Sequence, residues 1–194
     1  MAILKVARMG HPVLRRAAKP VDPAQIGSPA VQGLIRNMLD TVEEYEGAGL
    51  AAPQVHASVR IVVLTLDPDA GMEVWINPVI TPTTLDQLES YEGCLSVPGL
   101  RGCVRRAAEV HVEALDATGA PISLDLEGFP AIVAQHECDH LDGVLYVDRV
   151  ERRTLTFTEE HNRWGALLWD ASEPTEDAHD PSLDPSDTSH QAEA

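Results

Sequence analysis

Residues 135–143 read Gln-His-Glu-Cys-Asp-His-Leu-Asp-Gly and contain the pattern His-Glu-x-x-His. Side chains four positions apart lie on the same face of a helix, so His136 and His140 can bind a single metal ion. Glu137 follows the first histidine directly and is placed to act as a base toward whatever else the ion binds. This stretch therefore predicts a metal site on a helical turn.

Two upstream segments offer further groups to this site. Residues 92–96 read Glu-Gly-Cys-Leu-Ser, and residues 47–54 read Gly-Ala-Gly-Leu-Ala-Ala-Pro-Gln, a loop of small residues that ends in a side-chain amide. Cys94 with His136 and His140 would make a set of three protein ligands, which is typical of a catalytic site with one open position. The alternative for Cys94 is a small buried apolar residue.

The length and composition indicate one domain. The chain has 194 residues, of which 44% are hydrophobic, enough to fill a single core. No N-terminal apolar run precedes a cleavage site and no stretch approaches about 18 uncharged apolar residues, so we expect a cytoplasmic protein without a membrane span. The three cysteines are an odd number without the spacing of a disulfide framework, which favours reduced thiols or a metal ligand.

The net charge of −17 argues against a DNA or RNA partner, because phosphate neutralisation needs clustered Lys and Arg. Part of this charge lies in residues 170–194, which contain eight Asp or Glu and no Lys or Arg. Such a segment cannot bury enough apolar surface to fold. We therefore expect a catalytic domain over residues 1–169 and an acidic, disordered tail over 170–194, with an acidic interaction tail as the alternative.

The periodicity predicts segregated helices and strands. A helix is expected from Ser28, a good N-cap followed by proline, to Glu46, with Gly47 ending it. A second helix is expected over Pro130–Leu141, ended by Gly143. Strands are expected over Arg60–Leu66, Val74–Ile80, Glu109–Asp116 and Pro121–Leu126, while Thr154–Trp169 is ambiguous. The predicted fold is α+β, with small mixed or antiparallel sheets packed around a central helix that carries the His-Glu-x-x-His motif.

Taken together, the three segments resemble the three signature motifs of the peptide deformylases, and the resemblance runs from about Val6 to Arg149. It implies a metal-dependent hydrolase that removes the formyl group from the N-terminal formylmethionine of newly made polypeptides and releases formate. The implied cofactor is one divalent ion, iron(II) in this family, although zinc, nickel or cobalt also suits a cysteine with two histidines. The implied partners are N-formylmethionyl peptides on ribosome-associated nascent chains.

The resemblance also assigns roles in the reaction. It places the Gln54 side-chain amide and the backbone N–H of Leu95 at the oxyanion, Gly49 along the substrate backbone, and Arg101 near the mouth of the pocket. The alternative for Gln54 is a loop amide that satisfies backbone groups. Glu137 would transfer the proton, and its alternative role is to orient a histidine.

Several side chains near the motif have weaker signals. Phe129, Ile132 and Val133 could line an apolar pocket for methionine, although core packing explains them equally well. Asp139 and Asp142 are expected to support the ligands or cap the helix. 

The other two cysteines are not expected to bind the ion. Cys138 lies roughly 200° around the helix from His136 and is predicted to fill the core, and Cys103 has no motif around it.

Two other functions remain open on the sequence. A hydrolase of the same scaffold could act on another N-acyl substrate and would share the metal site. A non-catalytic metal-binding protein would need a fourth protein ligand to close the site, and Cys103 and Cys138 are the sulfur candidates.

Overall fold

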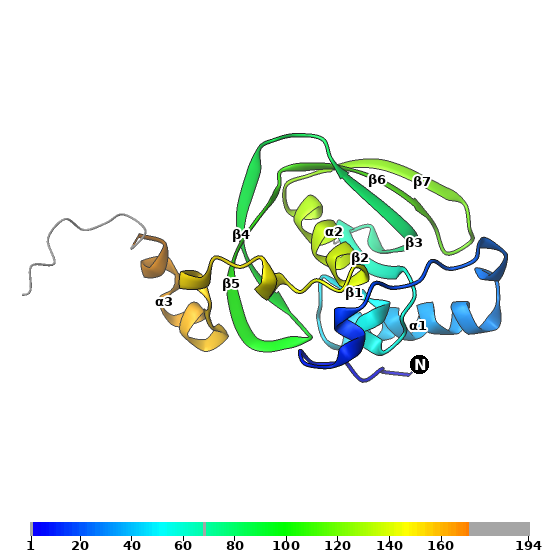
Figure 1. The fold of residues 1–194 in the computed structure, drawn as a ribbon, viewed down its shortest axis with the longest axis horizontal. Coiled ribbons are helices and arrows are strands. Elements are labelled where there is room, and N and C mark those ends of the chain that lie inside the picture. The colour runs from blue at the N-terminus through cyan, green and yellow to red at the C-terminus, as the bar shows by residue number, and fades with distance from the viewer. Residues whose placement is uncertain (1, 68, 171–194) are drawn as a thin grey trace, which may run out of the picture.

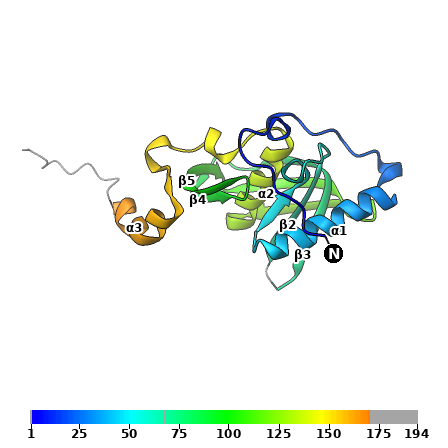
Figure 2. The same cartoon turned by 90° about the horizontal axis from the view of Figure 1, so that it is seen from below.

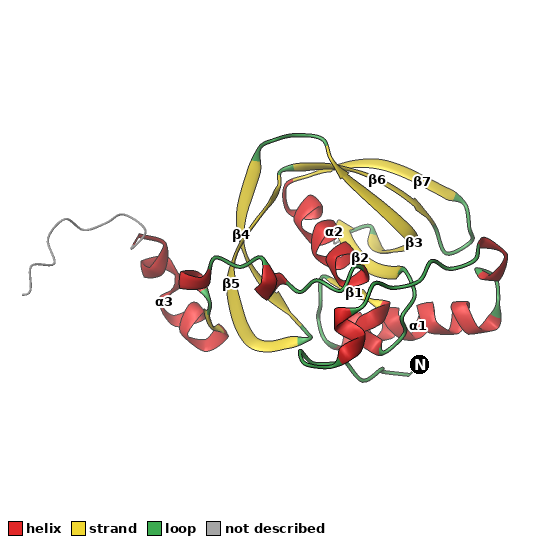
Figure 3. Cartoon of the chain, in the orientation of Figure 1, coloured by secondary structure: helices red, strands yellow, loops and turns green. Residues whose placement is uncertain are grey.

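The computed structural model describes residues 2–67 and 69–170, which contain eight strands and three α-helices (Figures 1 and 3). The helices are α1 (Pro29–Glu44), α2 (Gly128–Leu141) and α3 (Thr158–Asp170). The strands are β1 (Gly49–Ala51), β2 (Ile61–Asp67), β3 (Gly71–Pro82), β4 (Gln87–Cys94), β5 (Val97–Ala107), β6 (Glu109–Leu115), β7 (Pro121–Glu127) and β8 (Thr156–Phe157).

The larger sheet has the order β1-β2-β3-β6-β7, and every neighbouring pair is antiparallel. Its strands β2, β3, β6 and β7 cover the four strands predicted from the sequence. The predicted turn between the last two is present, because the Asp116 carboxylate accepts hydrogen bonds from the backbone N–H of Thr118 (2.7 Å) and of Ala120 (2.9 Å). The α+β class predicted from the sequence is confirmed.

Strand β2 connects the two main cores of the domain. Its apolar run is fully buried, and alternate side chains enter different clusters. Ile61 and Val63 pack with α1, while Val62 and Leu64 pack with α2. Because successive side chains of a strand point to opposite faces, the sheet lies between the two helices at this strand. A strand buried on both faces is expected to read as a continuous apolar run.

Helix α2 is buried on most of its surface and packs against β1, β2, β3 and β5. It contains residues 136–140 and lies between the β4–β5 hairpin and the larger sheet, as two perpendicular views show (Figures 1 and 2). It begins at Gly128, two residues before the predicted start, and Pro130 occupies the first turn, where a missing N–H costs nothing. Gly143 follows the helix with a φ of 76°, as the prediction of a glycine stop requires.

Helix α1 begins as predicted, because the Ser28 hydroxyl accepts a hydrogen bond from the N–H of Val31. Its end differs from the prediction. The helix stops at Glu44, and Glu46 rather than Gly47 takes the left-handed conformation, with a φ of 51°. The N–H of Gly47 then donates to the carbonyl of Val42 at 3.0 Å. A non-glycine residue can therefore close the helix here, at some conformational cost.

The smaller sheet, which has the order β4-β5-β8, was not predicted from the sequence. Strand β4 has few buried side chains, and β5 contains a proline, two glycines and three arginines, a composition that reads as a loop. The two strands form an antiparallel hairpin in which Tyr91 pairs with Cys103. Strand pairing and the ion pair between Arg106 and Glu92 connect the two strands, and neither leaves a simple alternating pattern in the sequence.

The ambiguous segment Thr154–Trp169 forms β8, which pairs with β5, followed by α3 at the far end of the molecule from α1 (Figures 1 and 2). No helix among the described residues has the length and hydropathy needed to cross a membrane. The predicted acidic tail beyond Asp170 lies outside the described residues.

We predict that Gly143→Ala lowers the free energy of unfolding by about 3 kcal/mol, because the residue would be strained and its Cβ would contact backbone. A Cβ at Gly143 would lie 2.8 Å from backbone atoms of Arg15 and Arg16. Gly71 has a similar φ of 87° and open space around its Cβ position, so Gly71→Ala should cost only about 1 kcal/mol. Chemical denaturation of both variants measures their free energies of unfolding. Equal losses of stability in the two variants would show that the close approach of the backbone to Gly143 has no effect.

Candidate metal centre

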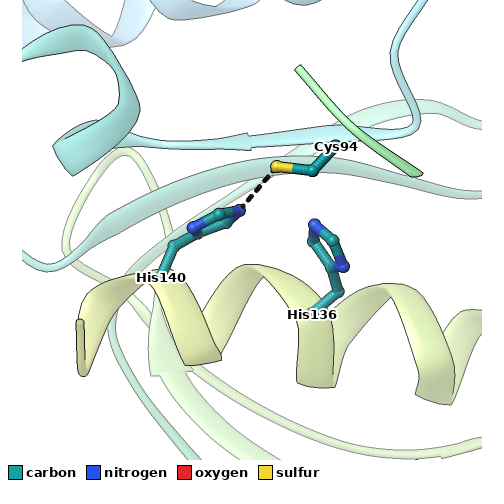
Figure 4. Close-up of side chains that lie close together, drawn as sticks. All are labelled: Cys94, His136 and His140. Carbon is teal, nitrogen blue, oxygen red and sulfur yellow. Dashed lines mark hydrogen bonds between the residues drawn. The ribbon is translucent and has the colours of Figure 1, made fainter. Parts of the chain in front are cut away.

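Cys94, His136 and His140 converge on one point (Figure 4). The two histidines project from successive turns of α2, and the cysteine ends β4 on the opposite side. One potential ligand atom from each residue lies within 4.8 Å of the other two, and the Cys94 Sγ is 3.2 Å from the His140 Nε2. The structure therefore brings together the three ligands that the sequence predicts.

The pKa values of the two histidines shift in opposite directions. Burial alone would lower the pKa of His136, but the hydrogen bonds with Cys94 and Glu92 outweigh it and raise the pKa to about 10. Burial lowers the pKa of His140 well below its ordinary value, so the imidazole is neutral, the form that binds a metal. Its Nδ1 has no hydrogen-bond partner among the described residues. Cys138 lies outside the cluster, and burial raises the pKa of its thiol to about 12, which keeps it protonated and a poor ligand. A sulfur and two imidazoles fit zinc, iron(II), cobalt or nickel.

Glu92 and Arg106 hold His136 in place, and the sequence analysis assigned no role to either. The Glu92 Oε2 lies 2.7 Å from the His136 Nδ1, so the other ring nitrogen is left for the metal position. Arg106 donates to both Glu92 oxygens, at 2.8 and 2.9 Å. Burial alone would raise the pKa of Glu92, but the hydrogen bonds from Arg106 and His136 outweigh it and lower the pKa to about 2. Glu92 is therefore ionised.

A further ion pair continues this network to the surface. The Arg106 Nη1 lies 2.5 Å from the Asp139 Oδ2, and Arg149 donates to both Asp139 oxygens, at 2.7 and 2.8 Å. Asp139 thus supports the ligand network, as the sequence predicts, whereas Asp142 pairs with Arg60 at 2.6 Å. No pattern in the sequence marked Arg106, because the strand that contains it was not predicted and its partners are distant along the chain.

The 47–54 loop presents its terminal amide to the ligands. The Gln54 Oε1 accepts a hydrogen bond of 2.8 Å from the N–H of Ala51. This bond turns the amide nitrogen toward Cys94 Sγ, at 3.5 Å, and toward Ser96 Oγ, at 3.3 Å. The amide is buried, with 2% of the residue exposed. Gln54 therefore offers N–H donors beside the metal position.

Glu137 contacts the same loop. A Cβ built on Gly49 would lie 2.6 Å from the Glu137 Oε1, so only glycine leaves room for this carboxylate. Glu137 is 4% exposed, and its Oε2 has no partner among the described residues. Burial raises the pKa of Glu137 to about 7, even though the charge on His136 lowers it. A carboxylate with a pKa near neutrality can take up and release protons under ordinary conditions.

A pocket of about 990 Å³ opens beside the ligands and is lined by Cys94, His136 and Glu137. The pocket is also lined by Gln54 and Leu95, which the resemblance places at the oxyanion, and by the predicted substrate contacts Gly49, Arg101, Phe129, Ile132 and Val133. Ile132 and Val133 are buried, while 62% of Phe129 is exposed. The volume is large enough for several residues of a peptide.

We predict that Arg106→Ala lowers the free energy of unfolding by about 3–5 kcal/mol, because it leaves the buried Glu92 without its partner. Arg105 provides a matched control, since its side chain is 72% exposed and pairs with Glu89 on the surface. Arg105→Ala should change stability little. Urea denaturation of both variants tests this, and a similar small loss in both would show that the buried pair does not stabilise the fold.

Comparison with known proteins agrees with this geometry. A profile of the family described as polypeptide deformylase matches residues 3–155. Peptide deformylase 1 of Prochlorococcus marinus is 44% identical over 177 residues, which cover 86% of this chain and 91% of that protein. Peptide deformylase 1 of Nitrosomonas europaea is also 44% identical, over 81% of this chain and 93% of its own length.

Solved structures show the same fold. The peptide deformylase of Thermotoga maritima superimposes with a TM-score of 0.73 at 36% identity, covering 78% of this chain and 99% of that one. The class I type b enzyme of Acinetobacter baumannii with bound Met-Ala-Ser gives a TM-score of 0.71 at 36% identity, over 76% of this chain and 98% of that one. The chain therefore belongs to the polypeptide deformylase family, the hydrolases that remove the N-terminal formyl group from newly made polypeptides.

Proposed function

We propose that Cys94, His136 and His140 hold one divalent ion and that the neighbouring side chains of this chain hydrolyse the formyl–nitrogen bond of N-formylmethionyl peptides. The observation that carries the proposal is the position of Glu137, buried beside the ligand cluster and open to the pocket. When bound, the ion supplies Lewis acidity that polarises the formyl carbonyl and eases deprotonation of water. The helix that carries the motif would be the centre of the catalytic domain.

Glu137 would move the proton. Its carboxylate takes a proton from the attacking water and then donates it to the methionine nitrogen as the carbon–nitrogen bond breaks. The products are formate and a free amino terminus. A pKa of about 7 supports both halves of this transfer, because the group can be ionised at the start and protonated midway.

The Gln54 side-chain amide and the backbone N–H of Leu95 would stabilise the developing negative charge on the formyl oxygen. A fixed donor of this kind is worth about 3 kcal/mol when water is excluded. The hydrogen bond from Ala51 to the Gln54 carbonyl oxygen supports this role, since it fixes the amide before the substrate binds. Gly49 would lie beside the backbone of the bound substrate peptide.

The substrate side chain would lie against Ile132 and Val133, with Phe129 at the edge and Arg101 near the mouth of the pocket. Methionine suits such a site because it is unbranched and adapts to an irregular apolar wall. The Acinetobacter relative binds Met-Ala-Ser, which supports a peptide in the corresponding pocket here. We propose that the chain acts in the cytoplasm on ribosome-associated nascent chains, with iron(II) as the ion.

The reaction and the metal are tested in an anaerobic assay with formyl-Met-Ala-Ser and its N-acetyl counterpart. The protein is loaded separately with iron(II), zinc, nickel and cobalt. We expect formate release from the formyl peptide and little turnover of the acetyl peptide. Equal rates on both peptides would favour a broader amidohydrolase, and formate release that is unchanged after metal removal would exclude the proposed centre.

Replacing Glu137 by Ala should leave the metal bound while it lowers kcat by about 10²–10⁴-fold, because Glu137 transfers protons and does not bind the ion. Metal content and kcat are measured on the same sample. A variant that loses its metal, or that keeps more than about a tenth of wild-type kcat, would contradict this role.

Replacing Cys94 by Ser should weaken metal retention, because a neutral hydroxyl is a poor ligand compared with a thiolate. Cys94→Asp should retain the ion and react much more slowly. Cys138→Ser provides the control. Because Cys138 lies outside the cluster, this variant should keep its full metal content. Competition with a chelator measures how tightly each variant retains the metal. If Cys138→Ser lost its metal while Cys94→Ser kept it, the proposed set of three ligands would be wrong.

A further inference from the structure

The rim of the pocket gathers positive charge in a strongly acidic chain. Apart from Glu92, His136 and Glu137 at the reacting centre, the charged residues that line the pocket are Lys5, Arg8, Arg101 and Glu46. Three cations therefore face one acid, whereas the whole chain carries a net charge of −17. The sequence analysis singled out Arg101 alone, and the two N-terminal cations have no motif around them.

Arg8 is held at this rim by the backbone on both sides. The N–H of Ala7 donates to the Gln54 carbonyl at 2.7 Å, and the N–H of Met9 donates to the Ser96 carbonyl at 2.8 Å. The N-terminal segment thus bridges the two loops that carry the amide donor and the cysteine. Arg8 lies between these two anchors, so its backbone position is fixed relative to the reacting centre.

These cations are not neutralised by the protein. Within the described part of the chain, Lys5 and Arg8 form no ion pair, and both are exposed. Arg101 donates from Nη2 to the carbonyl of Tyr91 at 3.1 Å, a neutral acceptor, and its buried Nε has no partner among these residues. All three charges remain available to a bound ligand.

We infer that this rim selects formylated peptides with an acidic side chain in the residues that follow methionine. The inference rests on the proposed function, because the pocket must hold a peptide whose first residue lies at the metal centre. A carboxylate there gains attraction from Lys5, Arg8 and Arg101, while a lysine is repelled. Exposed pairs are individually weak, so we expect a combined preference of about three- to tenfold in kcat/KM.

Three formyl peptides with amidated C-termini test the preference, formyl-Met-Ala-Asp, formyl-Met-Ala-Asn and formyl-Met-Ala-Lys, so that the third side chain is their only charge. At about 0.1 M salt the screening length is about 10 Å, so acids elsewhere on the chain contribute little while the rim stays effective. We expect kcat/KM for the Asp peptide to be about three- to tenfold higher than for the Lys peptide, chiefly because its KM is lower. At about 1 M salt the ratio should fall toward one.

The double variant Lys5→Gln/Arg8→Gln should reduce this Asp-to-Lys ratio at least about twofold at the lower salt. The control Lys19→Gln/Arg36→Gln changes the net charge equally, at exposed residues that do not line the pocket, and should leave the ratio unchanged. The inference would be overturned by equal rates on the three peptides, by a preference for the lysine peptide, or by the same change of the ratio in both double variants. Formate release in these cases would still uphold the proposed function. No turnover of any peptide would overturn both.

Discussion

The buried ion pair between Arg106 and Glu92 is the interaction on which the site depends. Both side chains are almost fully buried, so neither charge could remain there without the other. The pair joins β5 to β4, and Glu92 in turn contacts His136 on α2. Arg106 also pairs with Asp139, and Asp139 pairs with Arg149, so that the series of alternating charges continues to the surface. Every buried charge in this series thus has a partner of opposite sign.

This network also explains how the β4–β5 hairpin packs against α2. The β4–β5 hairpin contributes Val97 and Val104 to a small apolar cluster, and its charged residues Glu92 and Arg106 contact His136 and Asp139 of α2. The same contact orients His136 and sets Cys94, at the end of β4, opposite the two histidines. Packing of the hairpin and assembly of the cluster of Cys94, His136 and His140 are therefore one structural event.

The loop that precedes β2 supplies the other half of the centre. Gly49 leaves the space that Glu137 occupies, and Gln54 is fixed by a hydrogen bond from its own loop. The N-terminal segment closes over this loop and over Ser96, with Arg8 between its two anchors. Backbone hydrogen bonds thus connect the N-terminal segment to Gln54 and to Ser96, on both sides of the cluster.

The sequence by itself determined the α+β class, four of the five strands of the larger sheet, the two main helices and the three residues, Cys94, His136 and His140, that the structure brings together. These features follow from local periods, caps and the spacing of four between His136 and His140, which a single helix turn satisfies. Only the tertiary structure decided the β4–β5 hairpin and the roles of Glu92 and Arg106, because their stability comes from partners distant in sequence. Buried charge leaves no periodic signal, since the same residue types usually lie in solvent.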